Sequence, residues 1–246
     1  MFVVDKVLVV DAGNTSIKYT LFQESKVIWQ YRDEEALEIF HSMPHPDAIY
    51  VASVRSESAT SDIVNTLQAC FPTTALQVLC SQAQACGVKN AYDEPARLGV
   101  DRWLTVIAAH HHIGGNLVIV DAGTAIKVDV VSAVGEHLGG YITPGLALME
   151  QSLLTQTAKV RYVAEEVVSG NGLPNSTARA VAEGCHEMVL GFLDRIHNDY
   201  ADYQWVVTGG DGEVLMEKLG ISVIKQPYLV ALGAKLVGDE QVRGQK

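Results

Sequence analysis

Residues 7–18 read VLVVDAGNTSIK, and residues 117–127 read LVIVDAGTAIK. Each stretch is a mostly β-branched apolar run that ends in Asp-Ala-Gly and continues with Thr, a small residue, Ile and Lys once one residue is gapped. Self-similarity with starts 110 positions apart in a chain of 246 residues predicts two related halves, each opening with a buried strand and an Asp-Gly turn. Two such turns facing each other across a cleft can hold a polyphosphate from both sides, which indicates a nucleotide-dependent phosphotransferase.

The composition is that of a globular protein with enough apolar residues for a large core. Hydrophobic residues make up 48% of the chain and charged residues 19%. The formal net charge of −11 argues against a general surface for nucleic acid or anionic membranes, because phosphate groups attract Lys and Arg. Four cysteines without CxxC spacing, no secretory pattern and no apolar run of roughly 20 residues predict a cytoplasmic protein with no membrane partner.

Patterns typical of strands alternate with patterns typical of helices through both halves. The polar stretch 81–102 is expected to be a loop of functional importance, and 139–140 a glycine turn. The longest helix is expected to begin at an N-cap formed by Ser176 or Thr177. The expected strands span 7–13, 17–22, 26–32, 48–54, 75–80, 117–123, 126–135, 204–207 and the start of 223–238, and the expected helices span 34–43, 60–71, 103–113, 146–158, 178–200, 213–219 and the rest of 223–238.

The side chains of the first turn suit a bound phosphate. Asp11, at the end of a buried strand, can bind Mg²⁺ directly or through water, and Gly13 lets the backbone approach a ligand closely. The Asn-Thr-Ser run that follows offers hydrogen-bond donors, and Lys18 adds a point charge. The alternative is a tight turn whose Asp and Asn only satisfy the backbone, and one copy of the motif does not decide between the two.

A second copy and a third turn favour the ligand interpretation. Asp121 and Thr124 repeat the aspartate and threonine of the first turn, and Asp129 adds a carboxylate further on. The stretch TGGDG at 208–212 joins an expected strand to an expected helix and suits close approach of an adenosine or its phosphates. Glycine-rich turns of this kind are common, but the ordered set of three turns is more specific than any one of them.

The tetrapeptide GVDR at 99–102 lies between the two Asp-Gly turns, just before an expected helix. A carboxylate at Asp101 can take a proton from an attacking hydroxyl group. Arg102 can pair with a substrate carboxylate or with the transferring phosphoryl group. The alternative is a helix-capping aspartate beside a surface arginine, and the flanking turns make that the weaker interpretation.

The order of these motifs resembles the superfamily of actin, sugar kinases and heat-shock chaperone ATPases. Within it, DAGNTSIK, GVDR and DAGTA at 121–125 closely resemble the type III pantothenate kinases over essentially the whole chain. GVDR discriminates best, because sugar kinases and chaperones lack it there. The resemblance implies an α/β fold whose ribonuclease-H-like halves, 1–113 and 114–246, flank a nucleotide cleft. It also implies ATP-dependent phosphorylation of pantothenate to 4'-phosphopantothenate, the first step of coenzyme A biosynthesis.

The resemblance further implies roles for individual residues. Asp101 would be the base that acts on the pantothenate hydroxyl, Asp121 would coordinate a monovalent cation, potassium or ammonium, and Mg²⁺ would accompany ATP. The protein would be a homodimer, with the long second-half helix as candidate interface and Thr177 contributed across it. The ATP site would consist of Asp11, Ala12, Gly13, Asn14, Thr15, Ser16, Ile17, Lys18 and Thr124. The pantothenate site would consist of Tyr92, Gly99, Val100, Asp101, Arg102 and Thr177.

One position departs from the family pattern. The family usually has Thr where this chain has Lys127, so a cation stands beside the second turn. On one hypothesis its ammonium group takes the place of the monovalent cation or reduces the dependence on it. Alternation along IKVDV equally allows Lys127 to point away from the turn.

Two other functions stay open. One is a kinase of the same superfamily that acts on another small hydroxylated acid, against which GVDR and Tyr92 argue. The other is a non-catalytic regulatory protein, since some family members have been called accessory factors of transcription. The intact Asp11, Asp101 and Asp121 argue against an inactive enzyme, and the sequence pI of about 5.1 argues against direct DNA binding.

Overall fold

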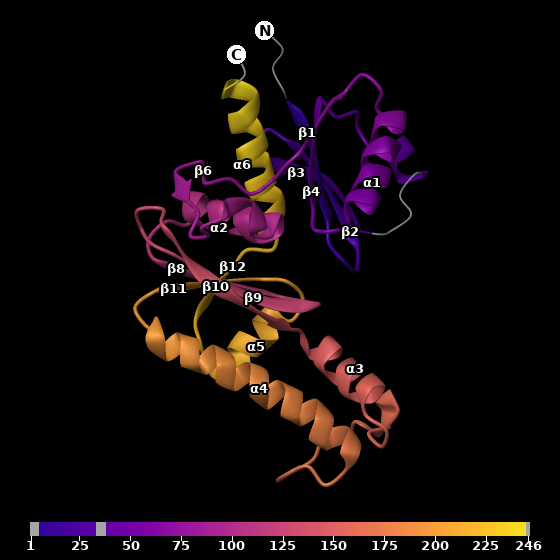
Figure 1. The fold of residues 1–246 in the computed structure, drawn as a ribbon, viewed down its shortest axis with the longest axis vertical. Helices are drawn as coiled ribbons and strands as arrows, with labels where there is room; N and C mark the ends of the chain where they lie inside the picture. The colour runs from indigo at the N-terminus through magenta and orange to yellow at the C-terminus, as the bar shows by residue number, and fades with distance from the viewer. Residues whose placement is uncertain (1–4, 33–37, 245–246) are drawn as a thin grey trace. The chain divides into compact units, whose positions relative to one another are not determined.

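The structure is a computed structural model that describes residues 5–32 and 38–244. The chain divides into two compact units (Figure 1). The first unit is Met1–Gly114 with Val131–Gly139 and Tyr228–Lys246, and the second is Gly115–Val130 with Gly140–Pro227. The predicted halves, 1–113 and 114–246, differ from these units, because the C-terminal segment and the tip of one hairpin group with the first unit.

The secondary structure follows the predicted alternation. The first unit contains β1 (Lys6–Ala12), β2 (Ile17–Gln23), β3 (Lys26–Arg32), η1 (Glu38–Ser42), β4 (Ala48–Ser53), α1 (Glu57–Cys70), β5 (Ala75–Val78), β6 (Gln84–Ala85), β7 (Val88–Lys89), η2 (Pro95–Arg97), α2 (Val100–His112) and α6 (Leu229–Gly244). Apart from the tip of the β9–β10 hairpin, the remaining elements belong to the second unit. They are β8 (Leu117–Ala122), β9 (Ala125–Val131), β10 (His137–Pro144), α3 (Leu146–Gln156), η3 (Ala164–Glu166), α4 (Thr177–Asp199), β11 (Gln204–Thr208), α5 (Gly212–Leu219) and β12 (Val223–Lys225).

The two larger sheets within the described residues have the same strand order. One runs β3-β2-β1-β4-β5, and the other runs β10-β9-β8-β11-β12. In both, the strand that carries the Asp-Gly turn is central and pairs in parallel with the fourth strand of its repeat, β1 with β4 and β8 with β11. The prediction of two related α/β halves is therefore confirmed at the level of topology.

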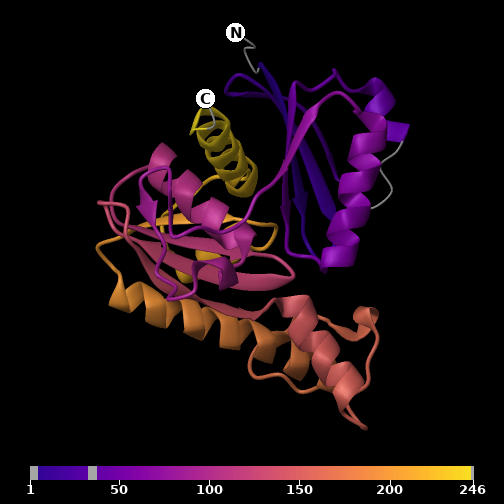
Figure 2. The same ribbon diagram turned by 45° about the horizontal axis from the view of Figure 1, so that its top comes forward.

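The first sheet is covered on both faces (Figure 2). On one face Leu8 and Val10 of β1 join a buried cluster with Leu67 of α1 and Phe71 just after it. On the other face α6 packs against β1 and β4. Burial on both faces explains why β1 reads as a continuous apolar run without alternation.

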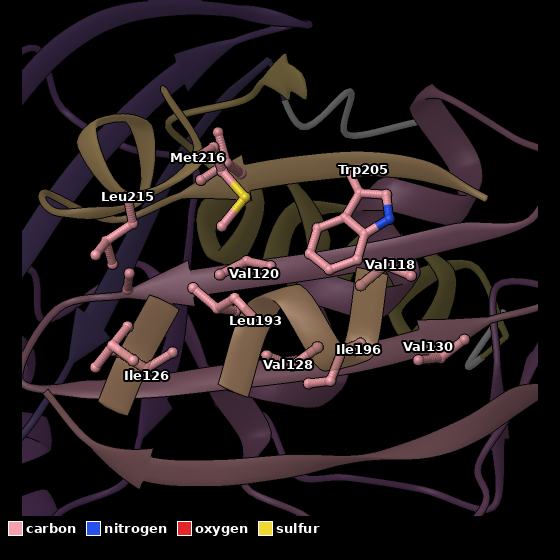
Figure 3. Packing of buried hydrophobic residues seen from close by; sticks show 13 residues of the cluster. Val118, Val120, Ile126, Val128, Val130, Leu193, Ile196, Trp205, Leu215 and Met216 are labelled. Atoms are coloured by element: carbon pink, nitrogen blue, oxygen red, sulfur yellow. The ribbon is translucent and has the colours of Figure 1, made fainter. Parts of the chain in front are cut away.

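The second sheet packs α4 and α5 on one face (Figure 3). Val120 of β8 and Val128 of β9 lie in this cluster with Leu193 of α4, Met216 of α5 and Trp205 of β11. Because side chains alternate along a strand, the residues between these point to the opposite face. Polar residues of β8 and β9 occupy that opposite face: Asp121, Lys127 and Asp129.

Helix α6 belongs to the first unit because two of its glycines permit close packing. A Cβ at Gly233 would overlap the backbone carbonyl of Leu104 in α2, and a Cβ at Gly238 would overlap the ring of Tyr50 in β4. The Tyr50 hydroxyl donates to Asp239 Oδ1 at 3.0 Å. Burial and this carboxylate raise the pKa of Tyr50 far above its usual value.

Several predicted elements need correction. Gly139 and Gly140 lie inside β10 and do not form a turn, because the surrounding His-Leu and Tyr-Ile-Thr residues favour an extended backbone. The predicted loop 81–102 contains the short hairpin β6–β7 and η2, and its last residues already belong to α2. The predicted helix over 34–43 lies partly outside the described residues, and the described part is the 3₁₀ helix η1.

No helix within 5–32 and 38–244 has the length and apolar character needed to span a membrane.

The contact between α2 and α6 yields a stability prediction. Gly233→Ala should lower the free energy of unfolding by about 2 to 3 kcal/mol, because the new methyl group meets backbone that cannot move aside. The matched control is Gly191→Ala in α4, where a Cβ meets nothing within 4 Å, and which should gain up to about 1 kcal/mol from helix propensity. Urea unfolding measures both. Equal stability of the two variants would contradict the packing of α6 on α2.

Candidate active site

The first Asp-Gly turn connects β1 to β2 in the first unit. Asp11 and Lys18 are opposite each other in the antiparallel pair, with Lys18 Nζ 3.7 Å from Asp11 Oδ2. The Gly13 amide donates to the Ser16 carbonyl at 3.1 Å and closes the turn. The Asp11 side chain is 14% exposed and that of Lys18 is 52% exposed. A largely buried carboxylate therefore lies at the carboxyl end of the central strand, beside a turn whose Asn14 and Thr15 face solvent.

A residue that sequence reasoning missed supports this turn. Arg55 follows β4, which runs parallel to β1, so its side chain starts from the same edge of the sheet. Arg55 Nε donates to the Gly13 carbonyl at 2.7 Å. A guanidinium group at this point adds positive charge beside the turn that was predicted to hold phosphate. The available signal was a cation two residues after a buried parallel strand, in the stretch VASVR.

The GVDR tetrapeptide forms the start of α2. Asp101 lies in the first turn of the helix, and its Oδ1 accepts the amide of Arg102 at 2.8 Å. A Cβ at Gly99 would lie 2.7 Å from the same carboxylate oxygen. Gly99 therefore leaves the space that the carboxylate uses, and the positive end of the helix dipole favours a negative charge there.

Arg102 and Tyr92, which the resemblance assigns to one site, are brought together in the structure. Arg102 is 3% exposed, and its Nη1 donates to the Tyr92 hydroxyl at 2.9 Å. Asn90, which sequence reasoning missed, accepts the Tyr92 amide at 2.9 Å and donates to the carbonyls of Gln82 and Pro95. The segment before GVDR is therefore an ordered platform that fixes Tyr92 against α2.

The second Asp-Gly turn connects β8 to β9 in the second unit. Lys127 Nζ lies 2.8 Å from Asp121 Oδ2, and the two side chains are 21% and 22% exposed. The direction of Lys127, which alternation alone left open, is therefore toward the turn. Asp129 is buried on the same face of the strand.

The glycine-rich turn after β11 packs against the second Asp-Gly turn. Gly209 has a φ of +84°, and a Cβ there would overlap the Ala122 carbonyl. The Asp211 amide donates to that carbonyl at 3.2 Å. Thr208 is paired in register with Asp121 on the neighbouring strand. The TGGDG stretch thus lies at the same sheet edge as the second turn, as its predicted nucleotide role requires.

Two predicted ligand contacts lie on exposed positions of the second unit. Thr124 is exposed in the turn itself, and Thr177 is exposed at the first residue of α4. Ser176 is the N-cap of α4, because its side chain accepts the Arg179 amide at 3.3 Å. The hydroxyl of Thr177 is therefore not the capping group of its helix.

The two strand-end carboxylates differ in their fit to a cation. Asp11 offers the hard oxygen donors that Mg²⁺ prefers, and its lysine is 3.7 Å away and half exposed. At Asp121 a positive charge already lies at hydrogen-bond distance, since the Lys127 ammonium contacts Oδ2. Asp121 therefore does not fit a potassium or ammonium ion in addition to the lysine. Asp11 fits a magnesium ion brought with ATP.

Two sheets of one topology, each with an Asp-Gly turn on its central strand, define an actin-like fold. The model of the family described as type III pantothenate kinase matches residues 7–199. The chain is 59% identical to a type III pantothenate kinase of Marinomonas sp. (strain MWYL1) over 246 residues, which is the whole length of both. The chain therefore belongs to the type III pantothenate kinase family, and it is a phosphotransferase.

Solved structures agree on the fold. A protein of Campylobacter jejuni, described as a candidate Baf family transcriptional activator, aligns with a TM-score of 0.63 and 21% identity over 96% of this chain and 99% of its own. A candidate 2-dehydro-3-deoxygalactonokinase of Sinorhizobium meliloti aligns with a TM-score of 0.56 and 14% identity over 94% of this chain and 98% of its own. At these identities the similarity confirms the actin-like fold alone.

Arg55 yields a prediction about ATP. If the turn at residues 11–18 holds ATP as the resemblance implies, Arg55→Met should raise the KM for ATP by about tenfold with little change in kcat, because it removes a charged donor from the backbone of that turn. Steady-state kinetics at saturating acceptor substrate measure the two constants. The control is Arg97→Met, whose side chain is 74% exposed in η2, and which should behave as wild type. An unchanged KM for ATP in Arg55→Met would exclude a part for Arg55 in holding the turn.

Proposed function

We propose that the protein transfers the γ-phosphoryl group of ATP to the primary hydroxyl of pantothenate and so forms 4'-phosphopantothenate, the first step of coenzyme A biosynthesis. The observation that carries the proposal is the geometry of GVDR in a member of this kinase family. Asp101 has its carboxylate at the start of α2, and Arg102 is joined to Tyr92. A proton acceptor and a cation thus come from the consecutive residues Asp101 and Arg102, and the phenol of Tyr92 is held against the cation.

In this proposal Asp101 is the general base. Its carboxylate accepts the proton as the pantothenate hydroxyl oxygen bonds to the γ-phosphorus, and the bond from that phosphorus to the β,γ-bridging oxygen of ATP breaks to leave ADP. Proton transfer by a positioned carboxylate contributes typically 10²- to 10⁴-fold to a rate, by order of magnitude. The remaining acceleration comes from positioning and charge neutralisation.

The other residues bind and orient the two substrates. The first turn, residues 11–18, and Thr124 hold the phosphates of ATP through backbone and hydroxyl donors. Magnesium, when bound, neutralises phosphate charge, and Asp11 is its proposed protein contact. Gly99 and Val100 line the pantothenate site, and Arg102 and Tyr92 form its fixed polar wall. The mutual hydrogen bond supports this role, because it orients both groups before substrate binds.

The test of the substrate is ADP release by purified protein with Mg·ATP, with each candidate acceptor supplied in turn. Pantothenate should stimulate ADP release strongly, and mass spectrometry should show phosphopantothenate in equal amount. Stimulation only by another hydroxylated acid or by a sugar would retain the kinase class and reject pantothenate. Absence of turnover with every acceptor, together with specific DNA binding, would favour the regulatory alternative.

The role of Asp101 yields a kinetic prediction. Asp101→Asn should lower kcat by at least about 100-fold, because the amide cannot accept the hydroxyl proton. The KM for ATP should change little, since the phosphate turn is intact. Asp93→Asn is the control, an exposed position in the same segment, and it should retain wild-type kinetics. Near wild-type kcat in Asp101→Asn would remove Asp101 as the base.

The proposal includes a homodimer formed through the second unit. Helix α3 carries Leu148, Met149 and Leu153, yet none of its residues is buried. Tyr141 of β10 and Met188 of α4 are 54% and 67% exposed. These elements adjoin, because α3 packs on α4 and the Tyr141 ring contacts Phe192, one helical turn from Met188. An apolar surface over three elements supports an interface with a second copy.

The geometry of α4 supports the same interface. Its C-terminal half supplies Val189, Leu193 and Ile196 to the core beneath the sheet. Its N-terminal half, which begins at Thr177, continues past the sheet alongside α3 (Figure 1). A threonine at that end suits contribution to the substrate site of a partner, as the sequence resemblance implied.

The interface yields a prediction about assembly. Met188→Glu should convert the dimer into a monomer, because an unpaired carboxylate is costly to bury between apolar surfaces. Light scattering after size exclusion measures the mass. Val214→Glu in α5 is the control, a 54% exposed valine on the same unit, and it should remain dimeric. A dimeric Met188→Glu protein of normal stability would place the interface elsewhere.

The proposal locates the enzyme in the cytoplasm, with small molecules and a second copy as its partners. All four cysteines are free thiols, of which Cys80 is exposed and Cys185 is buried, and free thiols are typical of a reducing compartment. The net charge of −11 supports the expectation that nucleic acid is not a partner.

A further inference from the structure

We propose that the Lys127 ammonium group is a built-in cation at Asp121, so that the kinase works without a bound monovalent ion at that carboxylate. The inference rests on the proposed function for its kinetic test, though not for its binding test. It follows from a disagreement between the donor set at Asp121 and the potassium or ammonium ion that the resemblance placed there.

The geometry of the pair is that of a charge-assisted hydrogen bond. Lys127 Nζ donates to Asp121 Oδ2 at 2.8 Å, within the range of strong ammonium–carboxylate contacts. The side chains are 21% and 22% exposed, so the pair is screened by water less than a surface pair is. An ammonium group resembles a potassium ion in size and charge, and its position here is one that such an ion would take against this carboxylate.

The internal repeat shows that this pairing is a property of the motif. Lys18 and Lys127 occupy the same position in the two copies, and each is paired with the aspartate of its own turn. In the first copy the distance is 3.7 Å and the lysine is 52% exposed. In the second copy two residues connect Ala122, the last residue of β8, to Ala125, the first of β9, and the ion pair is closer and its lysine more buried.

The core fixes the direction of Lys127. Its neighbours in β9, Ile126 and Val128, are 1% and 0% exposed and lie in the cluster beneath the sheet. Figure 3 shows both on the face covered by α4 and α5. Turning Lys127 away from Asp121 would require a shift of one residue in strand register, which would expose both apolar neighbours. The fold therefore holds the ammonium group on the face that carries Asp121.

The chemical consequence concerns the nucleotide. An uncompensated carboxylate beside Thr124 would repel the phosphates that this turn is proposed to contact. A tethered ammonium neutralises that carboxylate permanently, whereas a free ion does so only in the fraction of molecules that have bound it. With threonine at position 127 the carboxylate would have to recruit an ion from solution. The protein should therefore lack the ion dependence that a threonine variant would acquire.

The kinetic experiment compares wild type with Lys127→Thr in pantothenate-dependent ADP release. Potassium chloride is titrated against tetramethylammonium chloride at constant ionic strength. Wild-type kcat/KM should vary by less than about twofold, while Lys127→Thr should fall by at least about tenfold without potassium and recover as potassium or ammonium is added. Lys26→Thr makes the same substitution at an exposed position in β3, and it should follow the wild type at every potassium concentration.

A second readout does not depend on activity. Thermal unfolding in the same two salts should show a higher Tm in potassium for Lys127→Thr alone, because an ion that binds only the folded state stabilises it. Lys127→Gln, which keeps a long polar side chain, replaces the threonine variant if that variant does not fold. In this variant too the Asp121 carboxylate lacks the lysine ammonium group, so the same response of Tm to potassium is expected.

Two results would overturn the inference. One is a saturable potassium requirement of the wild-type protein, and the other is a folded Lys127 variant with no response to potassium in either readout. Failure of the proposed function appears differently, as absence of pantothenate-dependent ADP release by wild type in every salt. In that case the thermal measurement still decides whether Lys127 occupies a cation position.

Discussion

The structure depends on a carboxylate at the end of a buried central strand, and this arrangement occurs once in each unit. In each unit an apolar central strand, buried on both faces, ends in Asp-Ala-Gly, so an aspartate emerges where backbone amides and a lysine can surround it. The neighbouring parallel strand brings further groups to the same edge, Arg55 in the first unit and the TGGDG turn in the second. The burial of the strand fixes the position of the carboxylate, because a shift of one residue in register would move all the buried apolar side chains to the opposite face.

Much of the fold was predictable from the sequence because the decisive signals are local. Strand runs, helix spacing and the duplicated turn each lie within a few residues, and the matching strand orders confirm them. The grouping of α6 with the first unit was not predictable, because it depends on Gly233 meeting the backbone of Leu104 from far along the chain. The glycines of β10 were misassigned because glycine alone does not specify a turn when its neighbours favour a strand.

In the candidate site, too, some residues could be predicted from the sequence and others could not. The aspartates and GVDR were recognisable as motifs, whereas Tyr92 was assigned only through the family resemblance. The structure joins Tyr92 to Arg102 of GVDR by a hydrogen bond. Arg55 was missed because the backbone carbonyl that it binds, that of Gly13, lies 42 residues earlier in the chain. Asn90 was missed because its contacts with nearby backbone groups belong to an irregular segment and not to a motif. The direction of Lys127 was undetermined because alternation fixes a face only after the core face of β9 is known.

The measurement that tests this account most directly is phosphorus NMR of purified protein mixed with Mg·ATP and pantothenate. Transfer to pantothenate predicts loss of the γ-phosphate signal of ATP with equal growth of ADP and of one phosphomonoester signal that splits through coupling to a CH₂ group. Such a spectrum shows transfer to a primary hydroxyl. Growth of the inorganic phosphate signal alone, or an ATP spectrum that stays unchanged in the presence of pantothenate, would contradict transfer to pantothenate.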